Sequence, residues 1–95
     1  MTELEFVPRA EATLARIETL LEQRDDDVDF QRSGNVLEIE LDNGHKIIIN
    51  RHDANQEIWV AAKSGGFHYA WHDGQWLSQR DGSELFARLA ELLGD

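Results

Sequence analysis

Residues 36–50 read VLEIELDNGHKIIIN, two alternating apolar segments joined by the turn sequence Asp42-Asn43-Gly44. A two-residue Asn-Gly loop would mix polar and apolar side chains on one face of the hairpin. A three-residue loop with Gly44 in the left-handed region shifts the pairing by one residue and makes one face entirely apolar. That face holds Leu37, Ile39, Leu41, Ile47 and Ile49. Because a one-residue slip flips every side chain, we predict the three-residue loop, which also places Glu40 opposite Lys46.

The residues that follow predict a continued antiparallel meander. Residues 57–62 form a third strand, with Ile58 and Val60 on one face and Trp59 on the other. Lys63-Ser64-Gly65-Gly66 turns the chain into a fourth strand at residues 67–72. Asp73-Gly74 is a strong hairpin signal, and a short fifth strand follows at residues 75–78.

Two amphipathic helices flank the strands. The first is predicted over residues 3–24, with Pro8 placed in its first turn, where a missing amide hydrogen costs nothing. Its apolar stripe has helical spacing and consists of Val7, Ala10, Leu14, Ile17 and Leu21. The sequence Asp81-Gly82-Ser83-Glu84 resembles a capping sequence, after which a second helix runs to about Leu93. Its apolar face consists of Phe86, Leu89, Ala90 and Leu93.

This pattern predicts one α+β domain over residues 1–95, a two-layer sandwich. Its two helices pack on one face of an antiparallel β-sheet of about five to six strands, and the other face is left toward water. A chain of 95 residues is long enough for one domain and too short for two.

Composition excludes several classes of function. The formal net charge is −10, from 19 acidic and 9 basic residues, so nucleic acid is an unsuitable partner, because phosphate contacts need clustered Lys and Arg. The absence of cysteine removes disulfides, thiolate metal sites and cysteine nucleophiles. No apolar run approaches the roughly 20 residues of a membrane span, and the acidic N-terminus is no signal peptide. A soluble cytoplasmic protein is expected.

Carboxylates crowd the end of the first helix and the turn after it. This acidic ridge consists of Glu18, Glu22, Asp25, Asp26, Asp27 and Asp29. Like charges one turn apart destabilise a helix, and a helix C-terminus is the unfavourable end for negative charge. The ridge is interpreted either as a solvated face or as a site for hard cations or a basic partner. Its spacing does not fit an EF-hand loop, and ligands on one convex ridge predict weak binding of low selectivity.

Histidine and tryptophan offer weaker signals. His68 and His72 share a strand face but stand about 13 Å apart, too far to hold one ion. Surface or cross-strand packing is favoured for these histidines, as for His45 and His52. Trp59 faces the open side of the sheet, near Arg51 and Lys46. It is interpreted either as part of a partner-binding patch or as a ring packed flat across neighbouring strands.

Several separate segments resemble one known family in the same order. They are Asp42-Asn43-Gly44-His45-Lys46-Ile47-Ile48-Ile49-Asn50-Arg51, Glu57-Ile58-Trp59-Val60-Ala61 and Gly65-Gly66-Phe67-His68-Tyr69. They look like bacterial members of the frataxin family, and the resemblance covers nearly the whole chain. The sequence departs from the family pattern at Ala54, often Pro, at Glu57, often Gln, and at Gln31, often acidic. The first helix also has no histidine.

The resemblance implies a non-enzymatic cytoplasmic protein that binds iron (Fe²⁺ or Fe³⁺) weakly through the acidic ridge. It also implies a role in iron–sulfur cluster assembly, as regulator or iron donor, through contact with the cysteine desulfurase and the scaffold protein. Carried over by position, the partner-binding residues are Glu18, Glu22, Asn50, Arg51 and Trp59. A monomer is expected, with metal-induced oligomers as a further state. Two alternatives stay open: a ferroxidase with iron storage, and an acidic interaction module whose binding of iron or other divalent cations is incidental.

Overall fold

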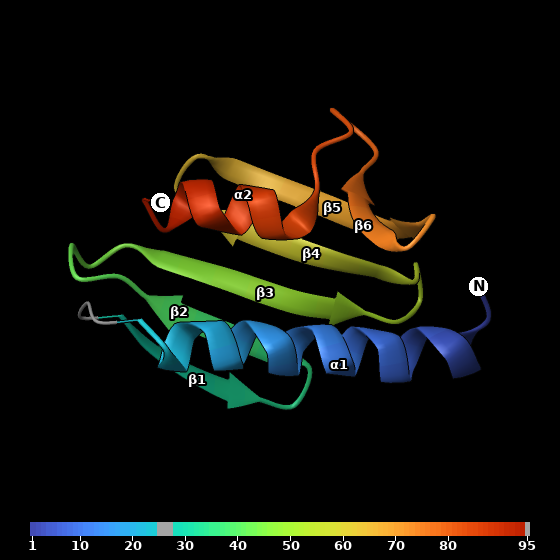
Figure 1. Ribbon diagram of the computed structural model, residues 1–95, viewed down its shortest axis with the longest axis horizontal. Helices are drawn as coiled ribbons and strands as arrows, with labels where there is room; N and C mark the ends of the chain where they lie inside the picture. The colour runs from blue at the N-terminus through green and yellow to red at the C-terminus, as the bar shows by residue number, and fades with distance from the viewer. Residues whose placement is uncertain (25–27, 95) are drawn as a thin grey trace.

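A computed structural model describes residues 1–24 and 28–94, and within them two helices cover one face of a six-stranded antiparallel sheet (Figure 1). The strands follow one another across the sheet in chain order, which confirms the predicted meander and sandwich. The elements are α1 (Glu3–Glu22), β1 (Asp29–Ser33), β2 (Val36–Glu40), β3 (Lys46–His52), β4 (Glu57–Ala62), β5 (Gly65–His72), β6 (Gln75–Ser78) and α2 (Leu85–Leu92). Within the described residues, neither helix is long and apolar enough to cross a membrane.

The β2–β3 hairpin has the predicted register. Glu40 is the Cα partner of Lys46, and Leu37 pairs with Ile49. Gly44 has a φ of 87°, and the Leu41 amide donates to the His45 carbonyl at 2.8 Å. The three-residue loop is therefore confirmed, and the side chains of its predicted apolar face on the two strands, Leu37, Ile39, Ile47 and Ile49, lie in the core.

Two details of the sheet differ from the sequence-based prediction. β1 was not assigned as a strand, because Phe30 is its only apolar residue. It forms by pairing along β2, with Phe30 opposite Ile39. The β4–β5 turn is also tighter than expected, because Ala62 pairs with Gly65 and leaves only Lys63 and Ser64 to reverse the chain.

The core joins the sheet to both helices through aliphatic side chains and a small aromatic group. Trp76 is 2% exposed and meets Phe6 edge-on at 6.0 Å and Trp71 at 5.2 Å between ring centroids. Its indole Nε1 donates to the Thr13 hydroxyl at 2.9 Å. This bond satisfies a buried donor and connects β6 to the middle of α1.

α1 differs from the expected helix in three respects. It ends at Glu22 instead of residue 24, and Phe6 instead of Val7 begins its buried stripe. Pro8 is the sixth helical residue and lies beyond the first turn. It has no amide hydrogen, so the helical hydrogen bond to the Leu4 carbonyl is missing. Leu4 is 89% exposed, and water around this surface can satisfy that carbonyl.

α2 begins within the predicted capping sequence, at its last residue. Glu84 is the N-cap, and its carboxylate accepts from the Phe86 and Ala87 amides at 2.9 and 3.1 Å. Asp81 instead accepts from the amide and hydroxyl of Ser83, at 3.0 and 2.7 Å, and forms an ion pair with Arg88 at 2.7 Å. These contacts fix the connection between β6 and α2.

Replacing Asp81 by Asn should destabilise the fold at neutral pH. Hydrogen bonds from Ser83, first from its amide and then from its hydroxyl, lower the pKa of the Asp81 carboxyl to about 2. Because the folded pKa lies below the unfolded value, the contribution is present above the unfolded pKa and is lost as pH falls through about 2. Urea unfolding should therefore show a constant difference between the two proteins from pH 7 to about 4.5, shrinking below that. An Asp42→Asn control should show no such difference.

Candidate functional site

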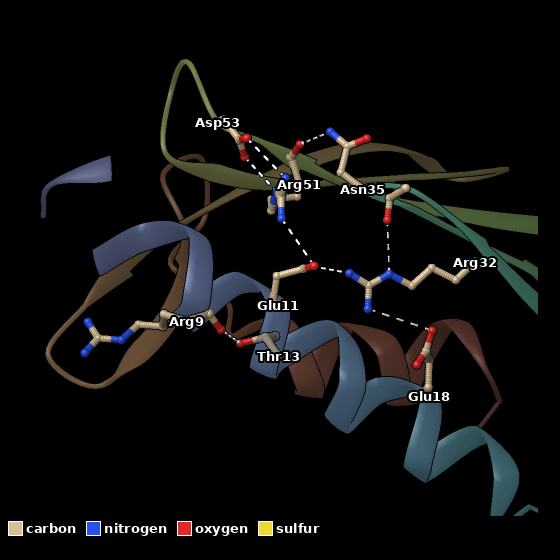
Figure 2. Close-up of polar contacts among 9 residues, drawn as sticks. Arg9, Glu11, Thr13, Glu18, Arg32, Asn35, Arg51 and Asp53 are labelled. Carbon is tan, nitrogen blue, oxygen red and sulfur yellow. Dashed lines mark hydrogen bonds and ion pairs between the residues drawn. The ribbon is translucent and has the colours of Figure 1, made fainter. Parts of the chain in front are cut away.

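Two carboxylates of α1, Glu11 and Glu18, face arginines from the sheet. Arg32, on β1, forms an ion pair with Glu11 and places its Nη1 4.0 Å from Oε1 of Glu18 (Figure 2). Its Nε also donates to the Gly34 carbonyl at 3.2 Å, which fixes the guanidinium at its base. The half-buried Glu18 therefore has a counter-ion inside the protein.

Glu11 lies between both arginines, as Figure 2 shows. Arg51, on β3, places its Nη1 3.4 Å from Glu11 and its Nε 2.8 Å from Asp53. Asn35 donates its side-chain amide to the Arg51 carbonyl at 2.9 Å and holds the neighbouring backbone. These contacts tie α1 to two strands through one carboxylate.

The remaining described ridge carboxylates have a different environment. Glu22 is the last residue of α1 and Asp29 is the first of β1, and both are exposed. Within residues 1–24 and 28–94, neither takes part in an ion pair or a side-chain hydrogen bond. Asp25, Asp26 and Asp27 lie outside the described residues. Glu22 and Asp29, at the two ends of the α1–β1 junction, therefore have no counter-ion among the described residues.

These exposed carboxylates can bind a hard cation, but the described ones do not form a tight chelating site. Exposed carboxylate oxygens are the ligands that hard divalent cations prefer, and high-spin iron accepts them as well. In the described part of the chain, no group of three or more His, Asp or Glu side chains converges on one point. Binding here would leave most of the cation's water shell in place.

Trp59 lies on the open face of the sheet, as predicted, opposite Asn50 and His68 in the register. Its ring is stacked between two imidazoles, with centroids 3.8 Å from His52 and 4.3 Å from His68 and planes within 9°. Its Nε1 donates to Glu57 at 2.8 Å. Trp59 is thus half-buried and held in one orientation on this face.

Of the two basic residues expected near Trp59, one lies on the other face of the sheet and the other is engaged in an ion pair. Arg51 has the same alternation as Ile47 and Ile49, so its side chain points to the helices, and its placement on the open face was wrong. Lys46 is on the open face but forms an ion pair with Glu38 at 3.1 Å, which, together with Glu40, raises the pKa of the Lys46 ammonium. Of the three sheet residues carried over by position, Asn50 and Trp59 share the open face.

The site includes side chains that sequence reasoning did not select. Arg32 and Glu11 meet across 21 residues of sequence, and nothing local in the sequence indicates that pairing. Glu57 and His52 were within reach, because both pair in register on the two strands that carry Trp59 and Asn50.

Comparison with known proteins identifies the family of this chain. The family model for the frataxin-like domain matches residues 1–95. The chain belongs to the frataxin-like family. It is 52% identical over 91 residues to the iron–sulfur cluster assembly protein CyaY of Paraburkholderia phymatum, covering 96% of this chain and 87% of the relative. The CyaY of a Janthinobacterium species is 57% identical over 98 residues, covering 98% and 88%.

Solved frataxin structures have the same fold. Frataxin from Psychromonas ingrahamii matches with a TM-score of 0.90 at 33% identity, covering 96% of this chain and 87% of that one. Trimeric yeast frataxin, described as complexed with ferrous iron, matches with a TM-score of 0.73 at 29% identity, covering 92% and 80%. The resemblance to frataxins and the predicted sandwich are both confirmed.

Proposed function

We propose that this protein acts in iron–sulfur cluster assembly, binding iron weakly at the α1–β1 junction and serving as regulator or iron donor. The observation that carries the proposal is the pair of exposed carboxylates, Glu22 and Asp29, that have no counter-ion within the described residues. Such groups attract a cation or a basic partner surface. Iron is the cation of choice because a yeast relative is described as complexed with ferrous iron.

The partners we propose are the cysteine desulfurase and the scaffold protein of the cluster assembly complex, in the bacterial cytoplasm. The bacterial relatives are themselves named iron–sulfur cluster assembly proteins. The ridge suits a basic patch on the desulfurase, whereas the oriented Trp59 with Asn50 suits the scaffold, because fixed aromatic side chains are frequent binding anchors. The two surfaces lie on different parts of the molecule, so both partners can be bound together.

The deciding experiment follows cluster formation on purified desulfurase and scaffold, with and without this protein, across iron concentrations. A change in the initial rate that depends on both iron and this protein supports the proposal. An unchanged rate at every iron concentration contradicts it. Oxygen consumption is measured in the same samples. We expect no catalytic excess over uncatalysed Fe²⁺ oxidation, because the described carboxylates do not converge to hold two iron ions side by side.

Removing charge at the junction should weaken cation binding and stabilise the metal-free fold. In Glu22→Gln/Asp29→Asn, mutual repulsion is reduced, so the metal-free melting temperature should rise. Addition of millimolar Mn²⁺ should raise the melting temperature less than half as much as in the parent protein, because fewer carboxylates bind the ion. Differential scanning fluorimetry measures both values. The control Glu3→Gln/Asp42→Asn removes the same charge elsewhere and should keep the parent's Mn²⁺ response.

A further inference from the structure

The carboxylates along the ridge side of α1 fall into two electrostatic groups. Glu11 and Glu18 face the guanidinium of Arg32, and Arg51 adds a second positive charge beside Glu11. Glu22 and Asp29 have no such partner in the described residues. The charge of the first group is therefore largely balanced by arginines, one of which is shared with Asp53, whereas the second group has no balancing charge among the described residues.

Arg32 is well placed to compete with a cation. Its guanidinium is held at three points, by Glu11, by Glu18 and by the Gly34 carbonyl. Because it is attached to the same chain, it is present at a high effective concentration and does not diffuse away. A cation that approached Glu18 would have to displace this group and then tolerate its charge a few ångströms away.

We propose that Arg32 is a tethered counter-ion that excludes cations from Glu11 and Glu18 and confines them to the α1–β1 junction. This inference rests on the proposed iron-binding function and specifies how it is limited. It explains how α1 keeps a stripe of carboxylates without becoming one long cation-binding surface. It also assigns Glu18 mainly to the contact between helix and sheet, and the junction to the exchangeable ion.

The test compares Arg32→Gln with Arg16→Gln, using Mn²⁺ alone as the probe. Arg16 is on α1, the helix that carries Glu11 and Glu18, is exposed, and stacks on Phe86 without an ion pair in the described residues. Its loss therefore changes the net charge by the same amount. Isothermal titration should show Mn²⁺ binding about fivefold to tenfold tighter for Arg32→Gln, from removal of one charge near a divalent ion. Arg16→Gln should stay within about twofold of the parent.

Location provides a second readout. Glu11 lies about 16 Å along the helix from Glu22. At low Mn²⁺ concentration, paramagnetic broadening of amide signals near Glu11 should be much stronger in Arg32→Gln than in the parent, relative to the broadening near Glu22. Arg32→Lys keeps the charge and should return the affinity to within about twofold of the parent. An equal gain for the Lys and Gln variants would show that charge is not responsible and would overturn the inference.

The outcomes separate this inference from the proposed function. If the parent binds Mn²⁺ at the junction and Arg32→Gln binds it identically, only the role of Arg32 is refuted. If neither protein binds Mn²⁺, both proposals are refuted. Should Arg32→Gln be unfolded without metal, Mn²⁺ should restore its folded spectrum, because Glu11 and Glu18 then become ligands. Failure of Mn²⁺ to do so counts against the inference.

Discussion

Replacing Trp76 by Ala is expected to lower the free energy of unfolding by about 3–5 kcal/mol, a large part of the roughly 5–15 kcal/mol that stabilises a typical domain. The side chain is almost fully buried and packs edge-on against Phe6 and Trp71. Its loss leaves a cavity between β6 and α1 and also removes the only described hydrogen bond from that indole, to Thr13. Urea unfolding followed by circular dichroism measures the change.

Smaller substitutions separate packing from hydrogen bonding at this position. Thr13→Val leaves the buried indole N–H without its acceptor and should cost about 1–3 kcal/mol. Trp76→Phe keeps an aromatic ring and removes the donor instead. The double variant removes both partners, so its cost should be smaller than the sum of the two single costs. Strict additivity would mean that the Nε1–hydroxyl bond contributes little.

Much of the sheet followed from local chemistry. The register of the central hairpin was predictable because one turn sequence and one apolar alternation had to agree, and only a three-residue loop satisfies both. β1 could not be found in the same way. An edge strand with a single apolar side chain takes its structure from pairing with β2, which local propensity does not report.

The candidate site likewise contains one feature that the sequence predicts and one that it does not. The position of Arg51 on the helix-facing side was predictable from the register, since it continues the alternation of Ile47 and Ile49. The contact of Arg32 with Glu11 and Glu18 was not, because it depends on how far β1 lies from α1. Spacing along α1 does not indicate this contact, because the counter-ion comes from the sheet.

Reversing the charge at Glu22 is expected to weaken binding of the cysteine desulfurase by about tenfold to a hundredfold, if the ridge docks on a basic patch. Like charges brought together across an interface cost several kcal/mol, and rim charges act mainly on the association rate. Glu22→Lys is the clean substitution because Glu22 is exposed and has no described ion pair. A Lys at Glu18 would instead face Arg32 and disturb the helix–sheet contact.

The matched control is Glu3→Lys, which makes the same change in net charge at the opposite end of α1. Stopped-flow binding to purified desulfurase, at several salt concentrations, should show a reduced association rate and a weaker salt dependence for Glu22→Lys only. Equal losses for both variants would mean that total charge, and not the ridge, steers the encounter. Unchanged affinity for Glu22→Lys at matched salt would rule out docking through the ridge. Because a bound cation would neutralise the same carboxylates, iron and the desulfurase should compete, and millimolar Mn²⁺ should slow association of the parent protein more than that of Glu22→Lys.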